Sequence, residues 1–303
     1  MYLQQSNYTF SLLLRLYLVI ILLMILDFHT HILPPGLREN RGHFSGRDPC
    51  FDLLYNDPKA KIATVEELIE NMDREGIDVS VVLNIGWSSH ELCYQTNDYI
   101  MEAIARYPSR LVGFCAVQPR AGDKAVVELE RCIRGGVKGI GELRSDTQGF
   151  DFAEAAIMGP IVKVAIKHRL IILTHASEPL GHLYSGKGDI TPGLLYRFIT
   201  SFPELTTVCA HWGGGLPFYA LMPEVAKALS NVYFDTAASP WLYRDEIFKH
   251  VTEIIGVEKV LYGSDYPLMK QSRLVKSIRA LSFSEEAKGM ILGGNAQKLL
   301  SLR

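Results

Sequence analysis

Met24-Ile-Leu-Asp-Phe-His-Thr-His31 is the stretch of this sequence that decides the fold. Its apolar residues predict a first β-strand, and His29 and His31 fall at the end of that strand. Because side chains alternate along a strand, residues two positions apart point to the same face. The two imidazoles are therefore expected to lie side by side.

Seven further short apolar runs follow, and helical patterns separate them. The strands are predicted at 78–84, 111–117, 137–142, 170–174, 205–210, 232–235 and 259–263. Helices are predicted at 64–75, 96–107, 123–134, 153–168, 192–202 and 244–255, and residues 284–300 are expected to form a final covering helix. Eight strands that alternate with helices form a parallel sheet that closes into a barrel. The sequence therefore predicts an α/β fold, a single (β/α)8 TIM barrel over residues 24–303.

The Pro- and Gly-rich stretch from Ile32 to about Ile62 is too polar and too often interrupted to predict a regular element. A long loop in this place can cover the active site of a barrel. His43 and Arg47 are its candidate lid residues, and a plain surface position is the alternative for His43.

Residues 1–23 form a hydrophobic extension before the barrel. The apolar run 10–26 contains Arg15, is near the short limit for spanning a bilayer, and is followed by no small-residue cleavage site. It also enters the first strand without a linker. We therefore expect translation to start at Met24, with residues 1–23 an artefact of an upstream start. A membrane anchor fused to the barrel is the alternative, and a cleaved signal peptide is the third.

Composition narrows the class of protein. The chain has 303 residues, 48% of them hydrophobic and 21% charged, which excludes intrinsic disorder. A formal net charge of -2 gives no basic field to attract nucleic acid. The five cysteines form no Cys-x-x-Cys pair, which argues for a reducing compartment and against a thiolate zinc site. We expect a cytoplasmic protein that binds a small-molecule substrate, and a homodimer is compatible with the sequence.

Six polar side chains fall where strands are predicted to end: His29, His31, Glu142, His175, His211 and Asp265. In such barrels the active site lies at the C-terminal ends of the strands, so these side chains are expected to meet at one rim. Each alone has an ordinary structural explanation, such as a buried core histidine or a helix-capping aspartate. Their joint placement predicts a metal site. Imidazole and carboxylate without thiolate suit a divalent metal, zinc first, with manganese and iron as alternatives.

Four motifs carry a family resemblance: Asp27-Phe-His-Thr-His31, Thr174-His175, Ala210-His211-Trp-Gly-Gly and Tyr262-Gly-Ser-Asp265-Tyr-Pro. They resemble the amidohydrolase superfamily, and more closely its amidohydrolase-related branch, which includes aminocarboxymuconate semialdehyde decarboxylase. The resemblance implies that His29, His31, His175 and Asp265 bind a divalent metal, with His211 near the substrate. Glu142 resembles a metal-ligating glutamate of TatD-like hydrolases, which leaves one or two ions open. A structural ion pair of Glu142 with Arg144 or another base is the alternative.

The expected activity follows from the metal. As a hydrolase, the protein would activate a metal-bound water to cleave a small amide, lactone or ester, with Asp265 as general base and acid. His211 would hydrogen-bond the oxygen on which negative charge develops. Glu142 favours this interpretation. The alternative is a metal-dependent, non-oxidative decarboxylase of a small unsaturated or aromatic acid, and a catalytically inactive binding protein is the third.

Five residues are candidate substrate contacts because they follow predicted strands: Arg144, His182, Tyr184, Lys187 and Trp241. Their side chains could bind a carboxylate or phosphate of the substrate. A solvated loop is the alternative for residues 182–187, and ordinary loop packing is the alternative for Trp241.

Overall fold

The computed structural model describes residues 24–302, and its centre is one sheet of eight parallel strands in sequence order. The strands are β1 (Leu26–His31), β2 (Val79–Leu83), β3 (Leu111–Cys115), β4 (Gly139–Leu143), β5 (Ile171–Thr174), β6 (Thr207–Cys209), β7 (Val232–Asp235) and β8 (Val260–Leu261). Each strand pairs with the next in parallel. All eight predicted strands are confirmed.

The sheet closes between its first strand and the chain that follows its last. The amide of Phe28 donates to Tyr262 O at 2.7 Å, and the amide of His31 donates to Tyr266 O at 2.7 Å. Between them, the amide of Asp265 donates to His29 O at 2.9 Å. The predicted (β/α)8 barrel is therefore confirmed.

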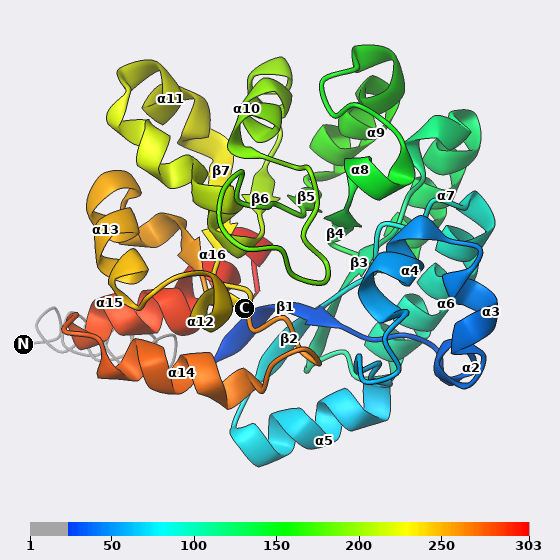
Figure 1. Ribbon diagram of the computed structural model, residues 1–303, viewed down its shortest axis with the longest axis horizontal. Coiled ribbons are helices and arrows are strands. Elements are labelled where there is room, and N and C mark those ends of the chain that lie inside the picture. Colours follow the sequence, from blue (N-terminus) through cyan, green and yellow to red (C-terminus); the bar gives the residue numbers. More distant parts are fainter. Residues whose placement is uncertain (1–23, 303) are drawn as a thin grey trace, which may run out of the picture.

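The principal helices form a ring around the strands (Figure 1). They are α5 (Val65–Glu75), α6 (His90–Arg106), α7 (Asp123–Arg134), α9 (Ala155–His168), α10 (Pro192–Ser201), α11 (Pro223–Ala228), α13 (Glu246–Ile255) and α14 (Gln271–Ala280). Short helices α8 (Ser145–Gln148) and α12 (Ser239–Leu242) follow β4 and β7. Within residues 24–302, no helix combines the length and the hydropathy needed to cross a bilayer. The hydrophobic extension 1–23, for which an upstream start artefact was expected and a membrane anchor was the alternative, lies outside the described residues.

The stretch 32–62 differs from the prediction because it holds three short helices: α2 (Pro35–Glu39), α3 (Arg41–Ser45) and α4 (Pro49–Tyr55). Proline is favoured at the first position of a helix, where no amide partner is needed, so Pro35 and Pro49 start helices here. Asp48 caps α4 by accepting from the amides of Cys50 and Phe51. Phe51 then stacks on Trp87 with ring centroids 5.6 Å apart.

The C-terminal helix is also less regular than predicted. It divides into α15 (Glu285–Gly289), a π-helical turn at Met290–Gly294, and α16 (Asn295–Leu300). Gly293 lies so close to the backbone of Met24 that any Cβ there would collide with Met24 O. This close contact packs the irregular turn against the start of β1.

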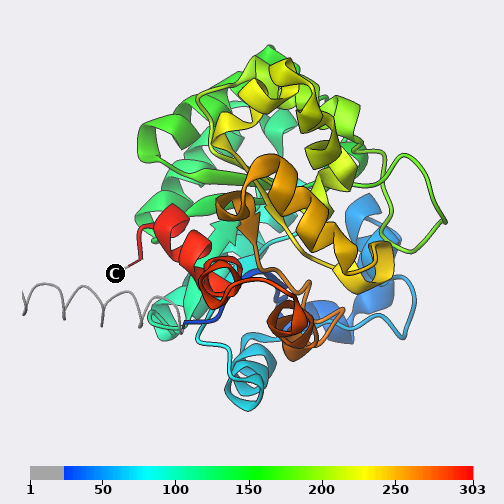
Figure 2. The ribbon, with the colours of Figure 1, turned by 90° about the vertical axis from the view of Figure 1, so that its left-hand side faces the viewer.

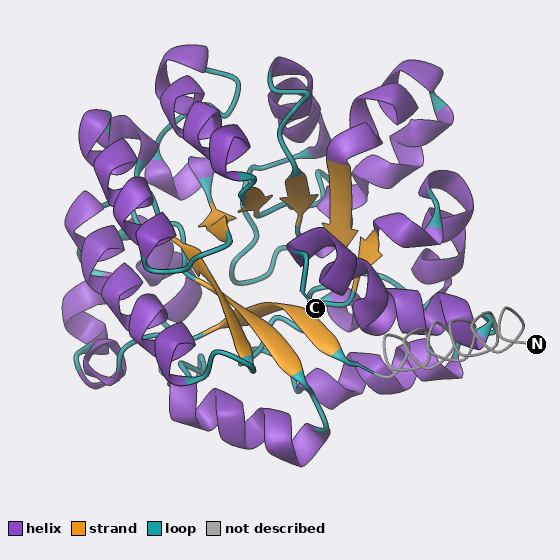
Figure 3. Cartoon of the chain, turned by 180° about the vertical axis from the view of Figure 1, so that it is seen from behind, coloured by secondary structure: helices purple, strands orange, loops and turns teal. Residues whose placement is uncertain are grey.

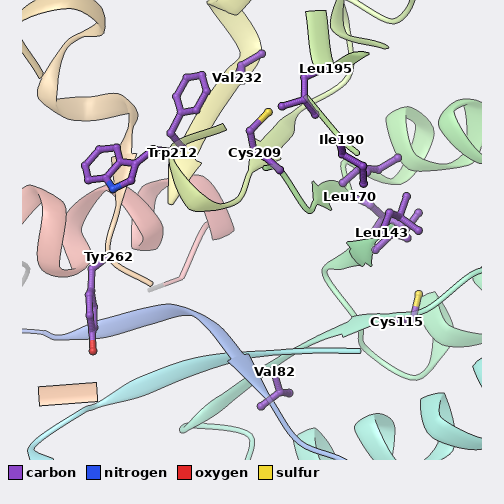
Figure 4. Packing of buried hydrophobic residues seen from close by; sticks show 14 of the residues in the cluster. Val82, Cys115, Leu143, Leu170, Ile190, Leu195, Cys209, Trp212, Val232 and Tyr262 are labelled. Carbon is purple, nitrogen blue, oxygen red and sulfur yellow. The ribbon is translucent and has the colours of Figure 1, made fainter. Parts of the chain in front are cut away.

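Two apolar layers hold the barrel together. One fills its interior and includes Phe28, Leu83, Phe114, Leu173 and Val208. The other lies between the strands and the helices, where Val82, Cys115, Leu143, Trp212 and Tyr262 pack (Figure 4). All five cysteines are buried and free. The view from behind shows the strands enclosed by the ring of helices (Figure 3).

Candidate metal centre and active site

Two histidines of β1 and one aspartate beyond β8 form a group of three closely spaced donor atoms. His29 Nε2 and His31 Nε2 are 3.0 Å apart. Asp265 Oδ1 lies 3.8 Å from His29 Nε2 and 3.7 Å from His31 Nε2. One point therefore lies about 2 Å from all three atoms, the distance at which nitrogen and oxygen bind zinc or a similar metal. The residues present fit a divalent ion.

The orientation of His29 supports this fit. Its Nδ1 donates to Asp235 Oδ2 at 2.8 Å, and both side chains are fully buried. With the proton on Nδ1, the lone pair of Nε2 faces the point shared with His31 and Asp265. A carboxylate behind a metal-binding histidine is the usual way to fix its tautomer.

The carboxylates around His29 stabilise positive charge, whether it is carried by a proton on the ring or by a metal ion. Burial acts against a charged His29, yet Asp235, Asp265 and Glu142 raise its pKa to about 10. The lone pair of His29 Nε2 that would bind a divalent cation is the one that takes up this proton, so metal binding here would release a proton.

Glu142, on β4, lies between the histidines. Its Oε1 accepts from His175 Nδ1 at 2.8 Å and is 3.5 Å from His211 Nε2, and its Oε2 is 3.9 Å from His31 Nε2. Burial would raise the pKa of Glu142, but its hydrogen bonds with His175 and His211 and the charge of His29 hold it well below its usual range. Glu142 is therefore a buried carboxylate, and it forms a second close donor group with His29 and His211.

His175 lies beside these groups, with both ring nitrogens engaged. Nδ1 donates to Glu142, and Nε2 accepts from the Ser177 hydroxyl at 3.0 Å. Burial and the charge of Arg144 lower the pKa of His175 to about 4, which keeps the ring neutral. As the fourth metal ligand, His175 would have to exchange its Ser177 contact for the ion.

His211 follows β6 and turns its ring into the same cluster. Its Nδ1 donates to Ala237 O at 3.1 Å, and its amide donates to Asp235 Oδ1 at 3.0 Å. Burial opposes a charge on this ring, but Glu142 and Asp265 raise its pKa above the usual value. His211 can therefore hold a proton on Nε2, the nitrogen that faces the cavity and Glu142.

A left-handed backbone segment sets the position of His211. Residues His211 through Gly215 all have positive φ. At Gly213 a Cβ would come within 2.7 Å of the Phe234 ring, and at Gly214 it would collide with Ser177 O. Only glycine allows this close approach. The left-handed segment 211–215 thus packs the chain that follows β6 against the residues that follow β5.

Above the cluster lies a cavity of about 520 Å³. Its lining includes His31, Glu142, His175, His211 and Asp265, together with four of the predicted substrate contacts, Arg144, His182, Tyr184 and Trp241. The fifth, Lys187, instead donates through Nζ to Leu180 O at 2.8 Å and to His182 O at 3.2 Å. Its ammonium group holds together the loop after β5, which extends outward on the right of Figure 2.

Two kinds of functional residue were missed from the sequence. Asp235 ends the predicted strand 232–235, and its place at a strand end was the available signal. The cavity is also lined by Leu54 and Tyr55, at the end of the unpredicted helix α4, and by residues 57 and 59–61, which follow it. The expected lid residues His43 and Arg47 are both exposed and lie outside this lining.

Comparison with known proteins places decarboxylases among the relatives. The chain is 23% identical to a 2-amino-3-carboxymuconate-6-semialdehyde decarboxylase of Dictyostelium discoideum, with 91% of each chain covered. The fold matches 5-carboxyvanillate decarboxylase of Sphingomonas paucimobilis with a TM-score of 0.78 and 18% identity, covering 93% of this chain and 100% of the other. It also matches a dihydroxybenzoic acid decarboxylase of Polaromonas, solved with manganese and 2-nitroresorcinol, with a TM-score of 0.71 and 20% identity, covering 92% and 97%.

These relatives overturn the interpretation that favoured hydrolysis. They are decarboxylases, so the hydrolase prediction is wrong and the carboxy-lyase alternative is the better supported one. The hydrolase prediction depended on Glu142 as a ligand of a second metal, whereas the Glu142 carboxylate bonds His175. The Polaromonas structure contains manganese, so the comparison does not support the expected preference for zinc.

The family itself is shown by the extent of the sequence match. The family model described as Amidohydrolase matches residues 26–302, nearly the whole barrel. The matched range contains every donor of the metal centre, from His29 to Asp265. The chain therefore belongs to the amidohydrolase family of enzymes.

Proposed function

We propose that this enzyme is a metal-dependent, non-oxidative decarboxylase of a small unsaturated or aromatic acid. One observation carries the proposal: a three-donor metal group and a proton-holding histidine, His211, lie at the same cavity. Loss of carbon dioxide needs positive charge near the acid and a proton for the carbon that is left behind. The decarboxylase relatives support the same reaction.

His29, His31 and Asp265 would hold one divalent ion, with His175 as the predicted fourth ligand. Once bound, the ion supplies positive charge that orients an acidic substrate and stabilises developing negative charge. Manganese and zinc both suit this donor set. Asp235 fixes His29 in the tautomer that this role requires.

His211 would deliver the proton. The bond between the carboxylate carbon and the neighbouring unsaturated carbon breaks, and its electron pair stays on the latter. The proton on His211 Nε2 then passes to that carbon while carbon dioxide leaves, and solvent restores the proton to the ring. Glu142 stabilises the protonated ring before transfer.

Apolar groups of the cavity would exclude water from the reacting carbon. Leu54, Ala238, Leu242 and Pro267 lie in its lining. Weak solvation of a carboxylate favours its conversion to neutral carbon dioxide, because the charge is no longer stabilised by water. His182 and Trp241, which are more exposed than the metal donors, also line the cavity together with Tyr184, and we propose that all three contact the body of the substrate.

The direct test offers the manganese-loaded full chain a panel of unsaturated and aromatic carboxylic acids in D2O. We expect release of carbon dioxide with one deuteron at the carbon that lost it. The matched control is the exposed His250→Asn variant, which should behave like the parent, whereas His211→Asn should lose turnover and keep its metal. No carbon dioxide from any acid in the panel, with metal bound, would refute the proposal.

A further inference from the structure

Arg144, which follows β4, is the one lysine or arginine among residues 24–302 that is fully buried, with 1% of its side chain exposed. It stands two residues beyond Glu142, and both side chains line the same cavity. A buried cation is costly unless its charge and hydrogen-bonding groups are satisfied. Its partners therefore show what the position is built to bind.

The partners of Arg144 are too few for a buried guanidinium. Nη2 donates to Gly186 O at 2.8 Å and to Asp146 Oδ2 at 3.3 Å, while the buried Nε has no acceptor. A guanidinium has five N–H donors, and a carboxylate that met two of them side by side would form a stronger pair. Asp146 does not do this, because its contact is long and its Oδ2 also accepts from the amide of Asp189.

The surroundings hold the side chain in place toward the cavity. Gly86 packs against it so closely that a Cβ there would come within 2.7 Å of Arg144 Cβ. On the other side, a Cβ at Gly188 would collide with Asp146 Oδ2 and lie 2.6 Å from Arg144 Nη2. The amide of Arg144 is fixed by Gln148 Oε1 at 3.0 Å. The guanidinium is therefore pre-positioned by its neighbours.

The nearby acid of the metal cluster does not complete the pair. Glu142 already accepts from His175 and faces His211. The remaining source of an anion is the cavity itself. We propose that Arg144 forms a second anion-binding subsite, which takes a carboxylate of the substrate that does not react.

That this carboxylate is a spectator follows from the proposed decarboxylation, on which this part of the inference rests. The reacting carboxylate loses its charge as it becomes carbon dioxide. A buried ion pair to it would stabilise the ground state more than the transition state and slow the reaction. An ion pair to a second acid group persists through the step. The substrate class is therefore an unsaturated or aromatic acid with a second carboxylate.

The test compares two ligands that differ by one charge: isophthalate and 3-carbamoylbenzoate. Binding is measured by calorimetry on the manganese-loaded full chain and again after chelation. We expect isophthalate to bind at least about tenfold more tightly. Arg144→Met should bring the ratio of the two affinities close to one, whereas Arg120→Met should leave it unchanged. Arg120 is an exposed arginine outside the cavity that also donates to a backbone carbonyl.

A second variant should change the ratio of the two affinities in the opposite direction. Asp146→Asn removes the competing carboxylate, so the ratio should rise above that of the parent. If Arg144 and Asp146 form only a structural pair, the affinity ratio should not rise in this variant. Asp146→Asn therefore still tests the subsite if Arg144→Met does not fold. A parent ratio near one, undetectable binding of isophthalate, or no gain in Asp146→Asn would each overturn the inference.

The failure of this inference can be told apart from failure of the proposed reaction. Chelation should weaken both ligands and leave their ratio largely intact, because Arg144 is separate from the metal donors. A preserved preference for the diacid without any release of carbon dioxide would keep the subsite and reject the decarboxylase.

Discussion

His29 on the first strand and Asp235 on the seventh are joined by a hydrogen bond of 2.8 Å between Nδ1 and Oδ2. Oδ1 of the same carboxylate accepts from the amides of His211 and Ala237, each at 3.0 Å. One buried aspartate thus orients a proposed metal-binding histidine and the chain around the proposed proton donor.

Replacing Asp235 with Asn should weaken metal binding by about 10–100-fold. If the Asn oxygen keeps the two amides, its NH2 group faces His29 and favours the ring tautomer with the proton on Nε2, which removes the metal-binding lone pair. Competition with a chromophoric chelator measures the change. Asp265→Asn, which removes a proposed ligand outright, gives the reference loss, and unchanged affinity in Asp235→Asn would contradict the assignment.

The raised pKa of His211 predicts the pH profile of turnover. The ring acts in its protonated form, and Glu142 and Asp265 raise its pKa above 6.5, although burial opposes this. Turnover should therefore persist through neutral pH and fall as pH rises through the raised pKa. A turnover rate that climbs steadily in alkaline solution would be incompatible with His211 as the proton donor. His211→Asn should cost at least about 100-fold in kcat.

Metal analysis of the full chain should find one divalent ion per molecule. The two close donor groups share His29, and Glu142 Oε1 is already bonded to His175, so we expect them to hold a single ion. Chelation should lower the melting temperature by roughly 10 °C, because tight binding to the folded state alone stabilises it by about 4 kcal/mol at a thousandfold excess over Kd. Elemental mass spectrometry and calorimetry give both values. Two ions per chain would return Glu142 to a ligand role.

The stability of the segment around α4 should depend on the aromatic side chain of Phe51. Phe51 is fully buried and stacks on Trp87. Phe51→Ala should destabilise the fold by about 3–5 kcal/mol and speed amide hydrogen exchange in residues 49–61, which include one wall of the cavity. Leu183→Ala is the control, since that side chain is 89% exposed. Equal exchange in both variants would show that the stacking does not hold this segment.

The barrel could be predicted because each strand is an apolar run long enough to be seen locally, and the donor residues stand at the ends of these runs. The strand-end position of Asp235 was visible, but its role could not be assigned, because its partner His29 lies 206 residues away and only closure of the barrel brings them together. Pro35 and Pro49 were interpreted as breaks, although proline also begins helices. Lys187 was expected to reach the substrate, but the fold of its own loop directs its ammonium to two backbone carbonyls.

The proposed metal donors lie on both sides of the joint at which the barrel closes, His29 and His31 on the first strand and Asp265 just beyond the eighth. An ion bound to all three would act as a clasp between the two ends of the sheet. During synthesis this three-ligand site cannot form until the ribosome has released the last strand, so the ion would bind only after the barrel has closed. A chain shortened before Asp265 should not bind the ion in this way even if its earlier strands assemble.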